Sequence, residues 1–324
     1  MRENGIAIEN NFKKAIKNNM QIFLLLAIIL IACVALTIIE PNFISSTNIF
    51  NILQQVSTLG LVTLGAAVVL LSGNIDLSVG NLLAVCAVVG GKLVVDGYTD
   101  ESVIIMTVLL GIAAGIANGA IVTFSKVDSF IITLGLMSIY QAFALILCDG
   151  NNVYLKGAFD WLGSMKVAGV VPIQVRILAG AVAVMVFVMK YSKFGRRVYA
   201  IGGNEEVAYL AGIKVKVYKI AVYMVSGVFA SIGGLILLSR IRQATPAMGS
   251  DYALQSITAA VIGGVALSGG RGKILGVVFG TIMLGLINNA LNMLHVPSYY
   301  QYMVLGLVII LAVIVSNIGS NKKR

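Results

Sequence analysis

Residues 49–80 read IFNILQQVSTLGLVTLGAAVVLLSGNIDLSVG, and this stretch decides the class of fold. No charged residue occurs between Ile49 and Gly73, and that run exceeds the roughly 20 helical residues needed to cross a bilayer core. A single carboxylate, Asp76, then follows in a polar string that holds Gly73 and Gly80. We therefore predict a membrane-spanning helix that ends in a polar break.

The whole chain has the same apolar character. Of its 324 residues, 59 % are hydrophobic and 11 % are charged, and the mean hydropathy is +0.97. Soluble domains carry about 25 % charged residues, so this composition excludes a soluble enzyme domain, a disordered protein and a nucleic-acid-binding protein. The three cysteines, Cys33, Cys86 and Cys148, are odd in number and lie in apolar runs, which excludes a disulfide framework or a thiolate metal site. We expect no metal and no cofactor.

Ten stretches have the length and low charge of membrane spans, so we predict an all-α polytopic bundle, one transmembrane domain over residues 1–324. The predicted spans are 20–39, 49–73, 77–95, 102–125, 129–148, 171–189, 220–239, 252–270, 274–294 and 298–315. With the N-terminus inside, the cytoplasmic segments hold 17 of the 23 Lys and Arg residues. The positive-inside rule therefore predicts that both termini are cytoplasmic.

Polar residues inside these spans are candidates for function. A charge within a bilayer usually marks a functional site, and Asp76 either caps the following helix or contacts a polar substrate. The other buried polar groups are neutral; they suit a pathway for an uncharged, hydroxyl-rich solute, or else they bond one helix to another. The candidate pathway residues are Asp76, Asn74, Gln54, Thr58, Asn118, Asn288 and Asn292, of which the last two share a helix face.

The core lacks the ionisable groups of an ion-driven carrier, because Asp76 is nearly alone there. An intramembrane enzyme is also disfavoured, since Asp76 has no partner acid and no Ser–His pair is evident. The glycine-rich segment Leu267–Lys273 does not match a phosphate-binding loop, so the chain does not hydrolyse ATP by itself. A stand-alone secondary carrier of a sugar or polar solute and, less favoured, an intramembrane enzyme are the alternative functions.

The cytoplasmic loop at about residues 190–219 carries the signals of a short helix. Asn204 is a good N-cap, Glu205 and Glu206 place negative charge in the first turn, and Gly212 can end the helix. A helix of about two turns has too little apolar surface to be stable alone. We therefore expect it to dock on a partner; a solvated connector is the alternative.

Three motifs extend these observations: IDLSVG at 75–80, GRRVYAIGGNEEVAYLAGI at 195–213, and SITAAVIGGVALSGGRGKILGVVFGTIMLGLINNALNMLHVPSYYQ at 256–301. On these motifs, the chain resembles the permease subunits of bacterial ABC importers for monosaccharides of the ribose, xylose, arabinose and galactoside type. The resemblance extends over nearly the whole length of the chain. The resemblance implies a non-catalytic subunit that translocates a ribose-like pentose or related sugar by alternating access. Ser72-Gly73-Asn74-Ile75-Asp76 departs from the family's Gly-Gly-Ile-Asp, which leaves the sugar open.

The resemblance also implies partners and a location. These are a separate ABC ATPase subunit, a second permease chain, an extracytoplasmic sugar-binding protein and the lipid of a bacterial cytoplasmic membrane, with no nucleic acid. The region 195–213 resembles the coupling loop, in which Glu206, Ala208 and Gly212 fit a Glu-x-Ala-x-x-x-Gly pattern that seats in the ATPase. The predicted coupling residues are Asn204, Glu205, Glu206, Ala208 and Gly212. The outer loop around Trp161 is either a landing surface for the binding protein or an aromatic anchor at the membrane interface.

Overall fold

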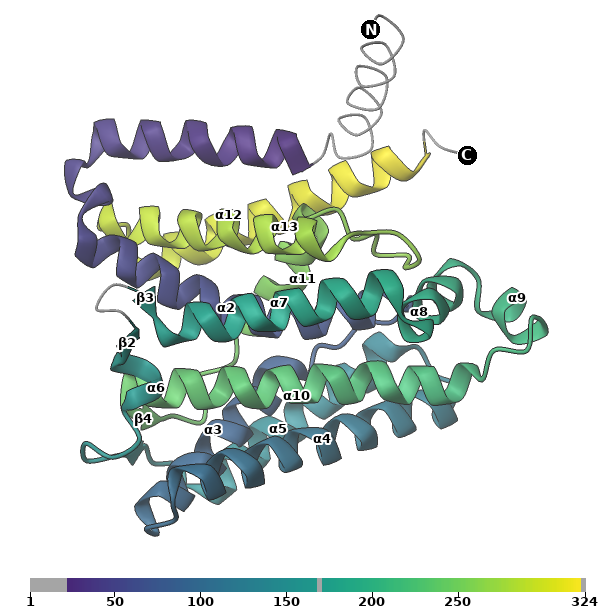
Figure 1. The fold of residues 1–324 in the computed structure, drawn as a ribbon, viewed down its shortest axis with the longest axis horizontal. Helices are drawn as coiled ribbons and strands as arrows, with labels where there is room; N and C mark the ends of the chain where they lie inside the picture. Colours follow the sequence, from purple (N-terminus) through teal and green to yellow (C-terminus); the bar gives the residue numbers. More distant parts are fainter. Residues whose placement is uncertain (1–21, 168–170, 322–324) are drawn as a thin grey trace, which may run out of the picture.

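The computed structural model describes residues 22–167 and 171–321 and is a bundle of helices (Figure 1). The longer helices are Ile22–Ile39, α2 (Ser46–Leu71), α3 (Val79–Val95), α4 (Asp100–Ser125), α5 (Ser129–Leu147), α7 (Ile173–Tyr191), α10 (Val215–Ile241), α12 (Ile274–Met293) and α13 (Ser298–Asn321). The shorter helices are η1 (Pro41–Ile44), α6 (Trp161–Ser164), α8 (Lys193–Gly203), α9 (Glu205–Leu210) and α11 (Tyr252–Ile262).

Two short antiparallel ladders tie loops together at one end of the bundle. β1 (Val153–Tyr154) pairs with β4 (Gln243–Ala244), and β2 (Lys166–Val167) pairs with β3 (Val171–Pro172). Helices α8 and α9 lie at the opposite end (Figure 1). The bundle therefore has a β-laddered end and an α8–α9 end.

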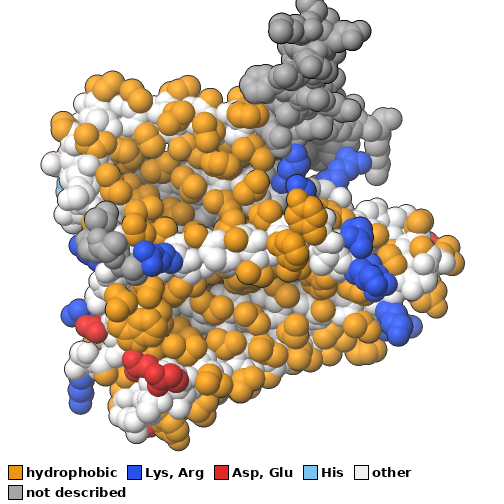
Figure 2. Space-filling model, in the orientation of Figure 1, with side chains coloured by type: hydrophobic (Ala, Val, Ile, Leu, Met, Phe, Trp, Pro, Cys, Tyr) orange, Lys and Arg blue, Asp and Glu red, His pale blue; other side chains and the backbone are white. Residues whose placement is uncertain are grey.

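Apolar helices occupy all ten predicted spans. Seven described helices are long and apolar enough to cross a membrane, and the shorter apolar helices Val79–Val95, Tyr252–Ile262 and Ser298–Ile314 fall in the other three predicted spans. The lateral surface in Figure 2 is mostly hydrophobic, with Lys and Arg side chains gathered near α8. The helical membrane bundle is thus confirmed, while the number of crossings and the side of the termini remain predictions.

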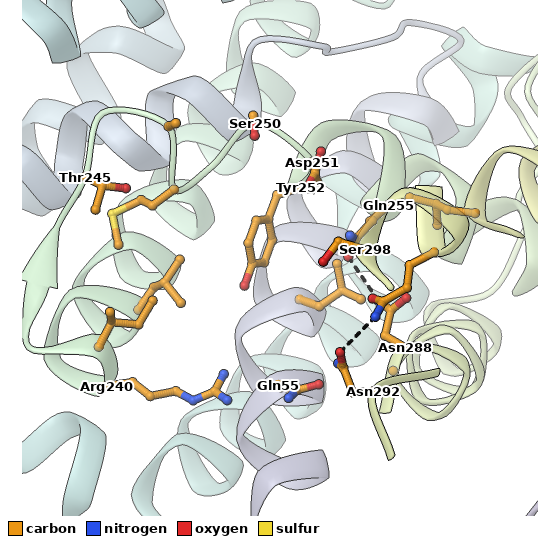
Figure 3. A pocket seen from close by; sticks show the side chains of 18 of the residues that line it. Gln55, Arg240, Thr245, Ser250, Asp251, Tyr252, Gln255, Asn288, Asn292 and Ser298 are labelled. Carbon is orange, nitrogen blue, oxygen red and sulfur yellow. Dashed lines mark hydrogen bonds between the residues drawn. The ribbon is translucent and has the colours of Figure 1, made fainter. Parts of the chain in front are cut away.

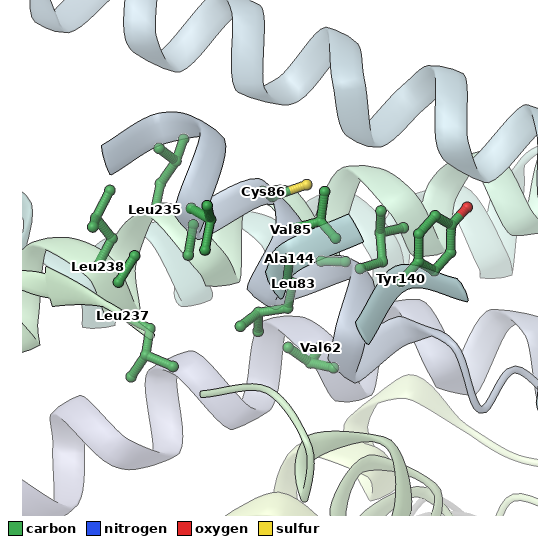
Figure 4. Close-up of a cluster of buried hydrophobic side chains, with 14 of the residues drawn as sticks. Val62, Leu83, Val85, Cys86, Tyr140, Ala144, Leu235, Leu237 and Leu238 are labelled. Carbon is green, nitrogen blue, oxygen red and sulfur yellow. The ribbon is translucent and has the colours of Figure 1, made fainter. Parts of the chain in front are cut away.

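Helices α2 and α10 form the centre of the bundle. Every residue of α2 from Val56 to Leu71 is buried, and α10 packs against α2, α3 and α4. Figure 4 shows part of the core beside them, where α3 side chains meet those of α5 and α10. The labelled residues are Val62, Leu83, Val85, Cys86, Tyr140, Ala144, Leu235, Leu237 and Leu238.

Glycines allow α4 and α10 to approach at backbone distance. A Cβ added at Gly111 would overlap the carbonyl oxygen of Gly227, and one at Gly119 would lie 2.7 Å from the Cα of Ile220. Gly276 and Gly280 make the same kind of contact between α12 and α11. Small residues at a spacing of four are typical of close helix crossings in membranes, and these glycines make such crossings.

The predicted span 252–270 needs a correction. Its helix, α11, ends at Ile262, because Gly264 adopts a φ of +89° that starts a turn, and the chain then runs irregularly to α12. A helix of 11 residues is about 16 Å long, about half of a bilayer core. The segment is therefore a half-helix followed by a non-helical turn, which parallels the break between α2 and α3.

Candidate functional site

The break between α2 and α3 is organised around the buried Asp76 carboxylate. Its Oδ1 accepts the backbone N–H of Ser78 at 3.0 Å and the Ser78 hydroxyl at 2.6 Å. Its Oδ2 accepts the Ser226 hydroxyl of α10 at 2.9 Å. Asp76 is only 3 % exposed. Hydrogen bonds to a charged group are among the stronger ones, so Asp76 fastens the break to α10.

A polar chain continues from this carboxylate to α4 and α5. The Asn118 amide nitrogen donates to the Ser78 hydroxyl at 3.0 Å, and the Tyr140 hydroxyl donates to the Asn118 carbonyl at 2.6 Å. The Tyr223 hydroxyl also donates to the carbonyl of Ile75 at 3.0 Å. A fully satisfied buried network of this kind fixes one arrangement of the helices around it.

A separate cavity of about 760 Å³ opens at the β-laddered end. Its walls come from the first half of α2, the end of α10, the loop 243–251, the start of α11, the end of α12 and the start of α13 (Figure 3). The polar residues that line it are Gln55, Arg240, Gln243, Thr245, Ser250, Asp251, Tyr252, Gln255, Asn288, Asn292, Ser298, Gln301 and Tyr302. Amides, hydroxyls and aromatic rings dominate, which suits a solute rich in hydroxyl groups.

Two of the predicted pathway residues line this cavity. Asn288 lies 3.5 Å from the side-chain oxygen of Gln255, to which it donates, and Gln301 donates to the Asn292 carbonyl at 3.1 Å. Figure 3 draws both contacts as dashed lines across the wall formed by α11, α12 and α13. The predicted shared face of Asn288 and Asn292 is therefore present and faces the cavity.

The structure does not bring the other five predicted pathway residues to this cavity. Asp76 and Asn118 belong to the buried network, and the Asn74 amide bonds back to Ser72. The Gln54 amide donates to the carbonyl of Gly163 at 3.0 Å, and the fully buried Thr58 hydroxyl donates to the Gln54 carbonyl at 3.3 Å. These groups satisfy one another and the backbone, so they hold helices in place rather than face the cavity.

The sequence prediction missed most of the cavity lining. Gln54 and Gln55 are neighbours on α2, yet Gln55 faces the cavity while Gln54 faces α6. Successive residues of a helix point about 100° apart, so the two glutamines face different neighbours. Which one faces the cavity can be known only once the orientation of α2 in the bundle is known. Arg240 and Asp251 were also missed, because each lies at the end of a predicted span and resembles an interfacial charge.

The short helix predicted in the α8–α9 region is confirmed. The Asn204 side chain accepts the backbone N–H of Val207 at 3.0 Å, Glu205 and Glu206 begin α9, and Gly212 has a φ of +79°. Glu205 also pairs with Lys219 of α10 at 2.6 Å. The helix is therefore capped as its sequence predicts, and the ion pair, which was not predicted, ties it to α10.

Ala208 differs from its predicted role. It is 3 % exposed and packs against Ile201 and Val215 within the chain, so its side chain is not free for a partner. The apolar residues at the tip are instead Val207, Tyr209 and Leu210, which are 60 %, 70 % and 77 % exposed. These side chains, absent from the sequence prediction, form the surface that α9 presents.

The loop around Trp161 packs into the bundle. Phe159 and Leu162 are buried in the core, and the Trp161 indole N–H donates to Asp100 at 2.8 Å. The backbone N–H of Gly163 donates to the Ser239 hydroxyl at 2.8 Å. The segment therefore closes this end of α10, beside the cavity.

Comparisons with known proteins agree on one family. The sequence profile described as "Branched-chain amino acid transport system / permease component" matches residues 48–313. The chain is 37 % identical to the "Ribose import permease protein" of Bacillus subtilis over 88 % of its own length and 89 % of that protein. It is 36 % identical to the "D-allose transport system permease protein" of Escherichia coli K12, over 90 % of its own length and 89 % of that protein.

A solved structure has a similar fold. It is described as an inward-facing conformation of a putative metal-chelate type ABC transporter, and it aligns with a TM-score of 0.51 and 13 % identity. The alignment covers 90 % of this chain and 95 % of the other. At that identity the likeness concerns the fold alone.

Proposed function

The chain belongs to the family of permease components of monosaccharide ABC importers, and from that premise we propose that it forms one half of an ATP-driven sugar pathway. As a member of that family it is a multi-pass membrane protein and non-catalytic, with the ATPase on a separate subunit. Its substrate is a ribose-like pentose or a related sugar. A second permease chain completes the pathway.

The cavity at the β-laddered end carries this proposal. Its volume of about 760 Å³ lies within the usual range for small-molecule sites, roughly 300–1,000 Å³. Its amide and hydroxyl groups donate and accept hydrogen bonds without adding charge. We assign this cavity to the sugar as it enters from the extracytoplasmic side.

The charge distribution supports this orientation. Exposed cations gather at the α8–α9 end, where they include Lys190, Lys193, Arg196, Arg197 and Lys216 (Figure 2). The positive-inside rule places such an end in the cytoplasm. The cavity then faces outward, toward a sugar-binding protein, in a bacterial cytoplasmic membrane with both chain termini inside.

The α9 tip supports docking of the ATPase. Val207, Tyr209 and Leu210 expose apolar side chains on a short capped helix at the cytoplasmic end. A cluster of exposed apolar residues with polar surroundings is typical of a protein interface. ATP-driven movement of the partner enters the chain at this tip.

A junction of glycines links this tip to the membrane breaks. A Cβ at Gly202 of α8 would overlap the carbonyl oxygen of Leu71, at the end of α2, and would lie 2.5 Å from the nitrogen of Gly270. A Cβ at Gly269 would lie 2.5 Å from the Cα of Gly73. Where backbones are in direct contact, no flexible side chain can absorb a displacement. Movement of α8 is therefore passed to the break between α2 and α3 and to the turn before α12.

Uptake into proteoliposomes tests the proposal. The chain is purified with its bound ATPase, supplied with its binding protein, and assayed with D-ribose, D-xylose and D-allose as probes. We expect uptake only with ATP on the cytoplasmic side. Uptake driven by a sodium or proton gradient alone would identify a secondary carrier, and chemical conversion of the sugar by the purified chain would identify an enzyme.

A further inference from the structure

Arg240 is the one cation that lines the cavity, and its charge is unpaired within the described part of the chain. It lies in the last turn of α10 and is half-buried. No side-chain hydrogen bond or ion pair of its guanidinium occurs among residues 22–167 and 171–321. By contrast, Arg242, two residues further on, pairs with Asp160 at 3.2 Å. A partly buried, unpaired guanidinium is costly unless another group satisfies it.

The backbone beneath Arg240 is held firmly. A Cβ at Gly163 would lie 2.6 Å from both the N and the Cα of Arg240, so α6 presses directly on this turn. The Ser239 hydroxyl donates to the Phe159 carbonyl at 2.6 Å and accepts the Gly163 N–H at 2.8 Å. The Gly163 carbonyl in turn accepts the Gln174 side chain at 2.9 Å. The backbone of Arg240 is therefore held in place, while its side chain lines the cavity.

The opposite walls offer neutral groups and one anion. Figure 3 shows Arg240 extending toward Gln55 of α2, with Tyr252 between the two long walls of the cavity. Asp251 lies on the wall at the start of α11, and it has no ion pair among the described residues. The cavity thus carries one positive and one negative charge on separate walls, with no formal net charge in its lining.

We infer that Arg240 is a sugar-binding residue that determines the specificity of this cavity for neutral sugars with adjacent hydroxyl groups. The inference rests on the proposed function. A guanidinium presents several N–H donors in a fixed planar fork, which matches two neighbouring oxygens better than a point charge does. On the opposite wall, the Asp251 carboxylate accepts hydrogen bonds from sugar hydroxyl groups and balances the positive charge of Arg240.

The test compares Arg240→Gln with the matched control Arg242→Gln in the reconstituted complex. The measurements are ATP-driven uptake of D-ribose, D-xylose and D-allose, and ATPase activity without sugar. We expect Arg240→Gln to lower uptake of the fastest probe at least tenfold, equivalent to about 1.4 kcal/mol, with sugar-independent ATPase activity unchanged. Arg242→Gln, which does not line the cavity, retains uptake. Wild-type uptake by Arg240→Gln would overturn the inference.

A second variant separates the effect of the planar guanidinium donors from the effect of the positive charge. Arg240→Lys keeps the long stem and the positive charge but loses the planar donors. We expect its uptake to stay at least threefold below that of the wild-type protein, whereas full uptake would overturn the role of the fork. Absence of ATP-dependent uptake in the wild-type complex with every probe would instead contradict the proposed function, so the two failures are distinguishable.

Discussion

The backbone N–H of Gly270 donates a hydrogen bond to the carbonyl oxygen of Leu71 at 3.0 Å. This bond joins the turn before α12 to the end of α2, so the two non-helical breaks of the bundle are in direct contact. Gly202 of α8 packs on the same carbonyl. Helix α8 and both breaks therefore meet at a single backbone junction.

Gly202→Ala tests that junction against Gly203→Ala. A methyl group at Gly202 overlaps the Leu71 carbonyl, whereas one at Gly203 has no neighbour within 4 Å. Overpacking typically costs about 1–3 kcal/mol. We expect Gly202→Ala to lower ATP-driven uptake at least tenfold, while Gly203→Ala transports normally. Equal uptake by the two variants would show that the contact does not transmit movement.

Asp76→Asn tests the buried network, with the exposed Asp96→Asn at the other end of α3 as its control. Asparagine keeps one carbonyl oxygen, so the Ser78 and Ser226 bonds cannot all be retained. The Ser226 hydroxyl can only accept from the asparagine NH2 group, and all bonds to the former carboxylate become neutral ones, which are roughly half as strong. We expect insertion to be normal, thermal stability in detergent to fall and uptake to be impaired. Wild-type uptake and stability would contradict the assignment.

Sequence reasoning was sufficient for features that depend on local composition. The apolar runs predicted an apolar helix within each of the ten spans, because this feature depends on local composition, although α11 fills only the first part of its span. Asp76 was identified as either a cap or a substrate contact. Only the placement of Ser226, 150 residues away, shows that its hydrogen bonds are already satisfied.

The remaining differences depend on which face of a helix meets which neighbour. Gln54 and Gln55 are indistinguishable in composition, and Ala208 matches a partner-binding pattern although its own hairpin buries it. The end of α11 at Ile262 follows from the positive φ of Gly264, which the apolar continuation of the sequence conceals. Long-range packing determines each of these features.

Leu210→Ser tests the docking surface of α9. Leu210 is 77 % exposed, so its replacement leaves the internal packing of Ala208, Ile201 and Val215 intact. An interface residue that is a hot spot costs more than about 1 kcal/mol when it is truncated, which weakens binding at least about fivefold. We expect less ATPase to copurify with Leu210→Ser, at unchanged thermal stability. Ala208→Trp is the contrasting variant, because it disrupts the packing of α9 on α8 and α10 and so lowers both ATPase copurification and thermal stability. Normal copurification of the ATPase with Leu210→Ser would place the interface elsewhere.

The central claim is that ATP-driven movement at the cytoplasmic end changes access to the cavity at the other end. Its most direct measurement is the rate at which a membrane-impermeant maleimide, applied from outside, labels Asn288→Cys in the reconstituted complex. The unsubstituted protein, which keeps Asn288, is the control for labelling of the native cysteines. We predict at least a tenfold difference in that rate between the nucleotide-free and the vanadate-trapped complex. Equal labelling rates in the two states would contradict the account.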